Sequence, residues 1–357
     1  MVISGCGSSS QDPDRTTQAA GLSCSPGPAT SATSDAPSVG VQFHGTWADY
    51  TDDQRARVLD LMAAAGVTSV RVDATWAALQ PRSSGQWAAD QLDVLDTVVD
   101  MAVERHLSVL VTLLVSPAWA GGGDEGTRLP DDPADYASAI GFLADRYAGR
   151  VEAWEIWNEE NSDEFAQGAD PVGYTQLLTA AYPAVKAADP QALVVFGGTQ
   201  YNDDSFVAAA YTAGARGSFD VMATHPYPAP SDAAPTAEDD GTEYSLGHVA
   251  AVRDVMDRNG DSAVPIWFTE VGWSSHENSG GEEAYERGVT EEQQGDYLVD
   301  TLDLVRSDFP YVQRVFWYAE RDRTTGAPQI SHFGLLTTEL DPKPAAQDLA
   351  CYIQDAR

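Results

Sequence analysis

Short apolar runs alternate with longer amphipathic segments along most of this sequence. Residues 107–115 (LSVLVTLLV) are nearly continuously apolar, as strands covered on both faces tend to be. The pattern predicts eight strands of this kind, separated by helices. The predicted strands are 40–45, 68–73, 107–115, 151–157, 191–197, 218–224, 264–270 and 311–318.

The segments between these strands carry the start signals of helices. Thr51 and Gln54 form a capping box in front of the first amphipathic segment. Thr290 and Gln293 repeat that box in front of a later one. Pro183 lies inside the fourth predicted helix, where its ring and its missing N–H predict a kink or a break.

Eight strand–helix units predict an α/β fold of the (β/α)8 type, the TIM barrel, as a single domain over residues 39–357. Active sites of this fold gather at the C-terminal ends of the strands. The alternative is a doubly wound open sheet, which normally carries a glycine-rich phosphate turn after its first strand. Residues 43–47 (FHGTW) are no such turn, so the barrel is favoured.

Residues 1–38 contain Ser, Gly, Pro, Thr and Ala without apolar periodicity, which predicts a flexible leader. Within it, Ile3-Ser4-Gly5-Cys6 resembles the lipobox of bacterial and archaeal lipoproteins, in which the cysteine is acylated. A chance match of four residues is the alternative. The resemblance predicts an extracytoplasmic protein, secreted or lipid-anchored at the cell surface through Cys6.

Two further cysteines lie near the ends of the predicted barrel. Cys24 precedes the first strand, and Cys351 is in the last helix. Because the chain ends of a closed barrel meet, a Cys24–Cys351 disulfide is predicted in an oxidising compartment. Two free thiols are the alternative.

The charge balance narrows the range of partners. The chain has 55 acidic and 20 basic residues, a net charge of −35. Such a field repels phosphate backbones and anionic lipid headgroups, which argues against nucleic-acid and membrane-surface binding. No apolar run approaches the roughly 20 residues of a membrane span. The acid excess is typical of a salt-adapted surface, so we expect stability to rise with NaCl.

Carboxylates end two of the predicted strands. Asn158-Glu159-Glu160 follows the strand at 151–157, and Glu270 ends the strand at 264–270, each beside tryptophans. Two carboxyl groups across a cleft can hydrolyse a glycoside, one as a neutral proton donor and the other as an ionised nucleophile. Their proximity raises one of the two pKa values, which supports this division of roles.

Arg71 alternates with valines that should face the helices, so its side chain is expected to point into the barrel. A guanidinium there needs carboxylate partners. Glu155 lies two residues before Glu159 and is predicted to be such a partner rather than a catalytic group.

With these motifs the chain resembles the clan A glycoside hydrolases, retaining TIM-barrel glycosidases, and looks closest to family 39 and its family-5-like relatives. Residues 155–161 (EIWNEEN) and 269–273 (TEVGW) carry the resemblance, which extends over 39–357. It implies that Glu159 is the acid/base, Glu270 the nucleophile, and that no cofactor or metal is required. Relatives usually have proline where this chain has Glu160.

Further residues are predicted to bind the substrate. The resemblance implies that Asn158 contacts the sugar 2-hydroxyl, that Arg71 orients Glu270, and that Trp317 is the floor under the sugar. Tryptophans at the strand ends could instead be packed lid residues. The predicted substrate-binding residues are Arg71, Asn158, His225, Tyr227, Trp317, His44, Trp119 and Trp273.

The sequence thus predicts a monomeric retaining glycosidase whose partner is a carbohydrate with an equatorial, β-type linkage. The expected carboxyl separation is about 5–5.5 Å. One alternative is a non-catalytic carbohydrate-binding barrel at the cell surface. The other is a metal-dependent barrel hydrolase that uses His44, Asp73, His225 and Glu270. Loops 116–130, 226–243 and 272–288 are expected to shape the cleft.

Overall fold

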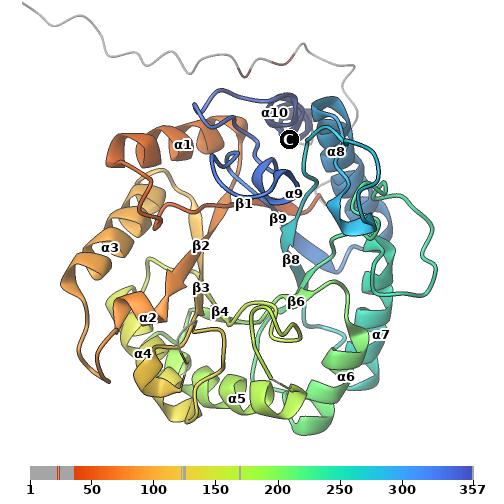
Figure 1. Ribbon diagram of the computed structural model, residues 1–357. Coiled ribbons are helices and arrows are strands. Elements are labelled where there is room, and N and C mark those ends of the chain that lie inside the picture. Colours follow the sequence, from red (N-terminus) through yellow and green to blue (C-terminus); the bar gives the residue numbers. More distant parts are fainter. Residues whose placement is uncertain are drawn as a thin grey trace, which may run out of the picture.

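Parallel strands form a ring at the centre of the molecule, and helices surround it, as the view down the barrel in Figure 1 shows. This is the predicted (β/α)8 barrel. The computed structural model describes Leu22, Cys24 and residues 36–121, 123, 126–168 and 170–355. Cys6 and most of the predicted leader lie outside this part of the chain, and the division into 1–38 and 39–357 stays a prediction.

The sheet has the strand order β5-β4-β3-β2-β1-β9-β8-β7-β6. A parallel bridge joins Val195 of β5 to Val221, the residue just before β7, so the ring closes and β6 lies beside it. Every predicted strand overlaps an observed one, and only β6 was not predicted. The strands are β1 (Ser38–Gln42), β2 (Ser69–Thr75), β3 (Ser108–Leu114), β4 (Ala153–Ile156), β5 (Leu193–Phe196), β6 (Thr199–Gln200), β7 (Met222–His225), β8 (Ile266–Val271) and β9 (Val312–Trp317).

The helices follow the strands in the expected alternation. None of those in the described part of the chain is both long and apolar enough to span a membrane. The helices are α1 (Asp52–Ala65), α2 (Trp76–Leu79), α3 (Ala89–Glu104), η1 (Ala118–Ala120), α4 (Pro133–Arg146), α5 (Pro171–Ala188), α6 (Asp204–Ala213), η2 (Leu246–His248), α7 (Val249–Arg258), η3 (Ala284–Glu286), α8 (Glu291–Asp308), α9 (Pro328–Ser331) and α10 (Pro344–Asp355).

Both predicted capping boxes are present, at Thr51 before α1 and at Thr290 before α8. A break at Pro183 does not occur, because α5 continues through it to Ala188. Pro183 and Thr179, whose carbonyl loses its helical partner, are both exposed. Water can therefore solvate that carbonyl, which lowers the cost of the proline.

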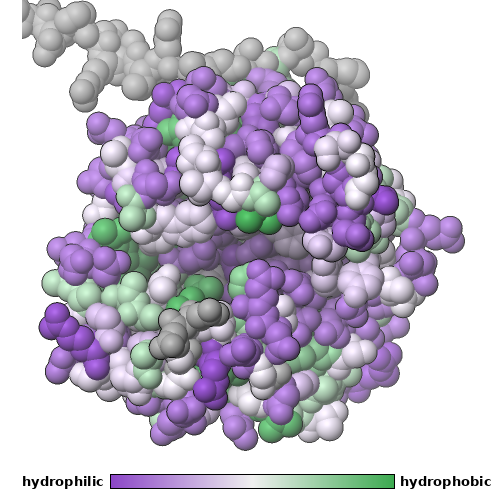
Figure 2. Space-filling model, viewed as in Figure 1, coloured by the Kyte–Doolittle hydropathy of each residue, from purple (hydrophilic) through white to green (hydrophobic). Residues whose placement is uncertain are grey.

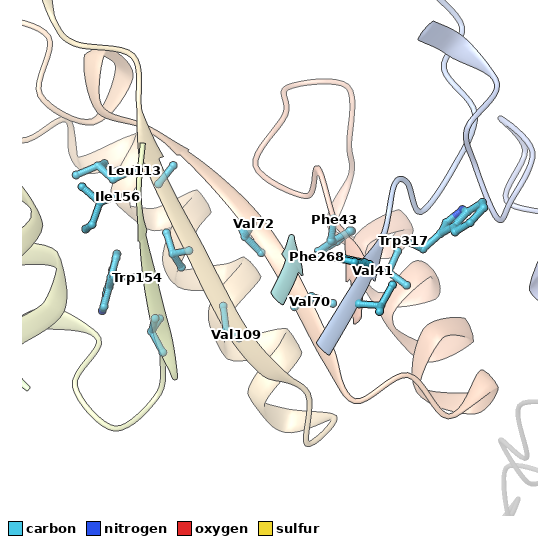
Figure 3. Close-up of a cluster of buried hydrophobic side chains, with 14 of the residues drawn as sticks. Val41, Phe43, Val70, Val72, Val109, Leu113, Trp154, Ile156, Phe268 and Trp317 are labelled. Carbon is cyan, nitrogen blue, oxygen red and sulfur yellow. The ribbon is translucent and has the colours of Figure 1, made fainter. Parts of the chain in front are cut away.

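Side chains of each strand alternate between two apolar layers. Val109 belongs to the large cluster between strands and helices, and Leu110 to a small cluster inside the barrel. Figure 3 shows Val70 and Val72 among the side chains of the large cluster. Arg71 lies between them in sequence, so the same alternation turns its side chain into the barrel, as predicted.

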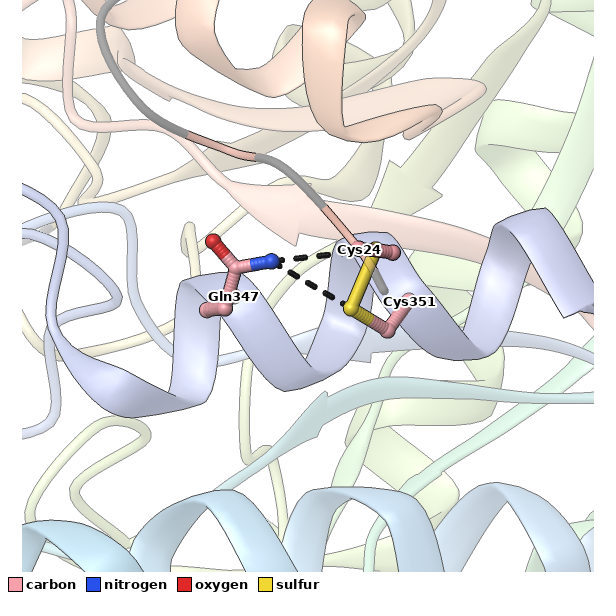
Figure 4. The surroundings of a disulfide bond; sticks show 3 residues. All are labelled: Cys24, Gln347 and Cys351. Carbon is pink, nitrogen blue, oxygen red and sulfur yellow. Dashed lines mark hydrogen bonds between the residues drawn. A yellow bond between two sulfur atoms is a disulfide. The ribbon is translucent and has the colours of Figure 1, made fainter. Parts of the chain in front are cut away.

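The predicted disulfide between Cys24 and Cys351 is present, with Cα atoms 5.3 Å apart (Figure 4). It joins the segment before β1 to α10. The Gln347 side-chain amide donates a hydrogen bond to the Cys351 sulfur at 3.2 Å. The two ends of the barrel are therefore linked covalently.

Candidate active site

A cleft of about 590 Å³ opens where the strands end. Figure 2 shows this face hollowed across its centre, with hydrophilic residues along the floor of the hollow. Of the three loops expected to shape it, 226–243 and 272–288 contribute lining residues, among them Tyr227 and Tyr285. Loop 116–130 contributes none of its described residues; Trp119 in that loop instead donates its indole N–H to the Gln80 carbonyl at 2.6 Å.

Glu159 and Glu270 meet in this cleft. One carboxyl oxygen of each, together with a ring nitrogen of His225, lies within 4.8 Å of the others. Retaining glycosidases have carboxyl groups about 5–5.5 Å apart, whereas inverting ones need about 6.5–9.5 Å to admit a water molecule. The limit of 4.8 Å is too short for the separation of inverting enzymes and lies close to that of retaining ones.

Glu270, on β8, receives two hydrogen bonds that favour its ionised form. Arg71 donates to its Oε1 at 2.6 Å, and the Tyr227 hydroxyl donates to its Oε2 at 2.9 Å. Burial alone would raise the pKa of Glu270. His225, Arg71 and Tyr227 outweigh burial and hold that pKa below its ordinary value.

Glu159 lies in the loop after β4, and its surroundings shift its pKa in the opposite direction. Its carboxyl contacts His225 Nδ1 at 2.9 Å and accepts a hydrogen bond from Gln200 at 3.2 Å. Burial raises the pKa of Glu159, and the charge of Glu270 raises it further, against the lowering effect of His225. The surroundings therefore shift the two pKa values in opposite directions, that of Glu159 upward and that of Glu270 downward.

Arg71 connects the residues beneath the cleft, with only 1% of its surface exposed. Its Nε donates to Glu155 at 2.7 Å, which confirms Glu155 as the expected carboxylate partner. Its Nη2 donates to the Asn158 side-chain oxygen at 2.7 Å. With the bond to Glu270, the guanidinium fixes groups from β4 and β8 at once.

The backbone after β4 takes conformations that non-glycine residues rarely adopt. Trp157 has φ 74° and Glu159 has φ 47°. The Glu159 N–H donates to the Gly198 carbonyl at 3.0 Å, which ties this turn to the segment after β5. Strained residues that persist at a cleft are typical of functional sites.

His44, Asn158 and Tyr227 line the cleft, as expected of substrate-binding residues. His225 lies behind it, fully buried, and contacts Glu159 through Nδ1 and Thr269 through Nε2. The His44 Nδ1 is 2.8 Å from the buried Glu320, so only part of this ring is available to a ligand.

Three predicted substrate-binding tryptophans lie elsewhere. Trp317 and Trp273 are buried and packed against each other with ring centroids 6.0 Å apart, and neither lines the cleft. Their indole N–H groups bind backbone carbonyls, as that of Trp119 does. Alternation places Trp317 outside the mouth and its neighbour Tyr318 inside it. None of the three tryptophans therefore lines the cleft, and Tyr318 lies there instead of its neighbour Trp317.

Several cleft residues escaped sequence analysis. Tyr318 directly follows β9, a position that could have indicated it. Gln200 and Tyr201 lie after a break in the fifth strand run, and Arg323 lies in the loop after β9, which no motif marks. Arg323 packs over the Trp47 ring at 4.5 Å.

The ligand set expected of a metal-dependent hydrolase is not assembled. In the described part of the chain, the one group of three close ligand atoms is Glu159, His225 and Glu270, without His44 or Asp73. Each of its members already has a hydrogen-bond partner, and the Arg71 guanidinium lies 2.6 Å from Glu270. A cation would be repelled by Arg71, so these residues fit a metal poorly.

Known proteins resemble this chain in fold. A family 39 glycoside hydrolase from the gut symbiont Bacteroides cellulosilyticus matches with a TM-score of 0.72 at 24% identity, over 89% of this chain and 64% of that one. A family 5 (subfamily 18) enzyme from Streptomyces cattleya, solved with GlcNAc, has a TM-score of 0.69 at 22% identity, over 89% and 80%. A β-xylosidase from Caulobacter crescentus has a TM-score of 0.68 at 17% identity, over 90% and 69%.

The chain thus spans somewhat less than two thirds of the length of the Bacteroides protein. These similarities concern the fold alone, whereas the sequence also matches a known enzyme family. Residues 31–318, most of the chain, match the family described as cellulase, glycosyl hydrolase family 5. The chain therefore belongs to glycosyl hydrolase family 5, the cellulase family of clan A enzymes.

Proposed function

We propose that this chain is a retaining glycosidase that cleaves a β-glycosidic bond by double displacement, with Glu270 as nucleophile and Glu159 as acid/base. One observation carries the proposal: the two carboxyl groups approach within 4.8 Å, and their surroundings shift their pKa values in opposite directions. Such a pair supplies an ionised nucleophile and a proton donor at the same pH.

In the first step the Glu270 carboxylate attacks the anomeric carbon, and the bond from that carbon to the leaving oxygen breaks. Glu159 transfers its proton to that oxygen, so the leaving sugar departs as an alcohol and a glycosyl–Glu270 ester remains. In the second step the Glu159 carboxylate takes a proton from water. The hydroxide oxygen attacks the same carbon, which frees Glu270 and restores the proton on Glu159.

The neighbouring groups have distinct roles in this proposal. Arg71 and Tyr227 hold Glu270 in line with the anomeric carbon. Because the Asn158 oxygen is occupied by Arg71, its amide N–H groups can donate to the sugar 2-hydroxyl. The Tyr318 ring replaces Trp317 as the apolar surface under the sugar.

We also propose that the protein works outside the cytoplasm as a monomer, either free or anchored through an acylated Cys6. The Cys24–Cys351 disulfide supports this location, because such bonds persist in oxidising compartments. Solved relatives in fold include a β-xylosidase from Caulobacter and an exo-β-1,4-mannosidase from an Opitutaceae bacterium. These make β-linked xylose and mannose, with glucose, the first substrates to screen.

The test uses aryl β-glycosides and β-linked oligosaccharides of these three sugars. We expect Glu270→Gln to lower kcat by about a thousandfold or more on every accepted substrate. Glu160→Gln is the matched control, since its carboxyl is buried beside Glu159 but does not line the cleft, and it should retain activity. An active Glu270→Gln variant would exclude Glu270 as the nucleophile.

Azide assigns the two roles separately. In Glu159→Ala, azide should replace water in the second step and yield a β-glycosyl azide, whereas Glu270→Ala should yield the α-azide by direct displacement. Proton NMR distinguishes the two anomers. An inverted first product from the wild type, or azide products of the opposite anomers, would contradict the mechanism.

A further inference from the structure

Tyr201, just after β6, has a backbone conformation that its side chain disfavours. Its φ is 60°, in the left-handed region that suits glycine. Two hydroxyl groups hold it there, because Thr224 and Thr199 donate to its carbonyl at 2.7 and 3.0 Å. A bridge to His225 joins the same residue to β7. The surrounding structure therefore holds the Tyr201 backbone in a strained conformation. Strain that persists beside a cleft is typical of functional residues, so we expect the Tyr201 side chain to have a function.

The Tyr201 ring lines the cleft next to the acid/base. Tyr201 is half-buried, and Tyr244 packs edge-on against its ring at 4.8 Å. Burial raises the pKa of the Tyr201 hydroxyl, and the charges of Glu159 and other nearby acidic groups raise it further. The cleft thus contains a neutral aromatic ring, and packing against Tyr244 fixes the position of that ring.

The proposed reaction determines on which side of the cleft the leaving group lies. The general acid must lie beside the glycosidic oxygen, whereas the nucleophile lies beneath the sugar whose anomeric carbon reacts. Glu270 is surrounded by Arg71 and Tyr227, and Glu159 contacts Gln200, the neighbour of Tyr201. The leaving group therefore departs toward Gln200 and Tyr201.

We infer that Tyr201 is the platform of a leaving-group subsite, on which the first sugar beyond the cleaved bond stacks. This inference rests on the proposed function. Aromatic rings offer a rigid apolar face to the C–H side of a sugar at little entropic cost. The exposed carboxylate of Glu164, which also lines this end, disfavours an acidic ring. The leaving group is thus a sugar without an acidic group, and the substrate is at least a disaccharide.

The experiment compares two substrates that differ only in the leaving group. One is the β-1,4-linked disaccharide of glucose, xylose or mannose, in the series on which the wild type is fastest. The other is the β-glycosyl fluoride of the same sugar, whose fluoride fills no sugar subsite. The variant is Tyr201→Gly, which removes the ring and relaxes the positive φ, so that the fold is retained. Phe142→Ala is the control, because Phe142 is an exposed aromatic residue of α4 that does not line the cleft.

We expect Tyr201→Gly to raise KM and to lower kcat/KM on the disaccharide roughly tenfold or more, the loss of one stacked ring. On the fluoride, kcat/KM should stay within about twofold of the wild type. Tyr201→Phe should behave as the wild type on both substrates, because the ring face and not the hydroxyl binds.

Three results would overturn the subsite. They are an unchanged kcat/KM on the disaccharide, an equal loss on both substrates, and a loss accompanied by a shift of the alkaline limb of the pH profile. The last would mean that Tyr201 acts through Glu159. Failure of the proposed function has a different signature, because Glu270→Gln would then still hydrolyse the fluoride.

Discussion

Glu159 and Glu160 are adjacent in sequence but have opposite surroundings. Glu159 lines the cleft, whereas Glu160 is fully buried and neither of its carboxyl oxygens has a hydrogen-bond partner. Burial raises the pKa of Glu160 well above its ordinary value, and the charges of Glu155 and Glu159 raise it further. Glu160 therefore keeps its proton in the folded protein to a higher pH than an exposed glutamate does.

This burial predicts a pH-dependent cost to stability. Above the ordinary pKa of glutamate, about 4.3, the unfolded chain ionises Glu160 and the folded chain does not. The cost therefore grows as the pH rises from that value toward the raised pKa. Glu160→Gln removes it, so we expect its melting temperature to exceed that of the wild type by roughly 2 °C or more at pH 7–8. The difference should vanish near pH 4; a constant difference at every pH would contradict this origin.

Tyr227 predicts a second pH effect, on activity. Its hydroxyl helps to keep the pKa of Glu270 low, and Glu270 must be ionised to attack. In Tyr227→Phe the pKa of Glu270 should rise, so the acidic limb of the kcat/KM profile should move to higher pH. At the optimum, kcat/KM should fall roughly tenfold, as expected for one hydrogen bond to a charged group.

Tyr244→Phe is the control for that variant, since Tyr244 does not line the cleft. A uniform loss of activity in Tyr227→Phe, with the acidic limb in place, would show that the hydroxyl acts on the sugar rather than on Glu270.

At the scale of elements, the turn between β5 and β6 determines how closely the two halves of the site approach. A Cβ on Gly198 would lie 2.1 Å from His225 Nε2 and 2.7 Å from Thr269 Oγ1. Only glycine leaves room for His225 to contact Glu159 there. This turn also ends the fifth strand run early and starts β6.

We therefore expect Gly198→Ala to displace His225 and to lower kcat/KM roughly tenfold or more, with a loss of stability of about 1–3 kcal/mol from overpacking. Gly141→Ala, within α4, is the matched control. Its Cβ would meet Ala184 at 3.5 Å, an ordinary contact, and alanine favours a helix by about 1 kcal/mol. Kinetics and thermal melts of both variants measure the contrast. Equal activity in the two would refute the steric argument.

Part of the fold and of the site was predictable from the sequence alone. Hydrophobic pattern and capping residues were enough to predict eight strands and the starts of α1 and α8, because these signals are local. Glu159, Glu270 and Arg71 were predictable because strand ends and alternation fix where they point. Tyr318 lines the cleft and Trp317 does not, because a shift of one residue along a strand reverses the face. Tyr201 depends on contacts between β6 and β7 that no local pattern encodes.

At the scale of the whole molecule, closure of the barrel brings Cys24 to Cys351, 327 residues later in the chain. The same closure brings β4 and β8 to one mouth, although their glutamates are far apart in sequence. Global topology was thus predictable from the count of strand–helix units. The position of each loop over the cleft was not, since it depends on packing among loops.

The net charge of −35 predicts how the stability of the protein depends on salt. If each of the 20 basic residues paired with one acidic residue, 35 acidic groups would still repel one another across the surface. Screening shortens this repulsion from about 10 Å at 0.1 M salt to about 3 Å at 1 M. Exposed ion pairs weaken too, but each contributes little. We therefore expect the melting temperature to rise between low and molar NaCl, most steeply below about 0.3 M. Below that concentration the rise should be equal in NaCl and in sodium perchlorate, because screening depends on ionic strength alone. A melting temperature that is flat or falls with NaCl would show that the acidic surface carries no net repulsive cost.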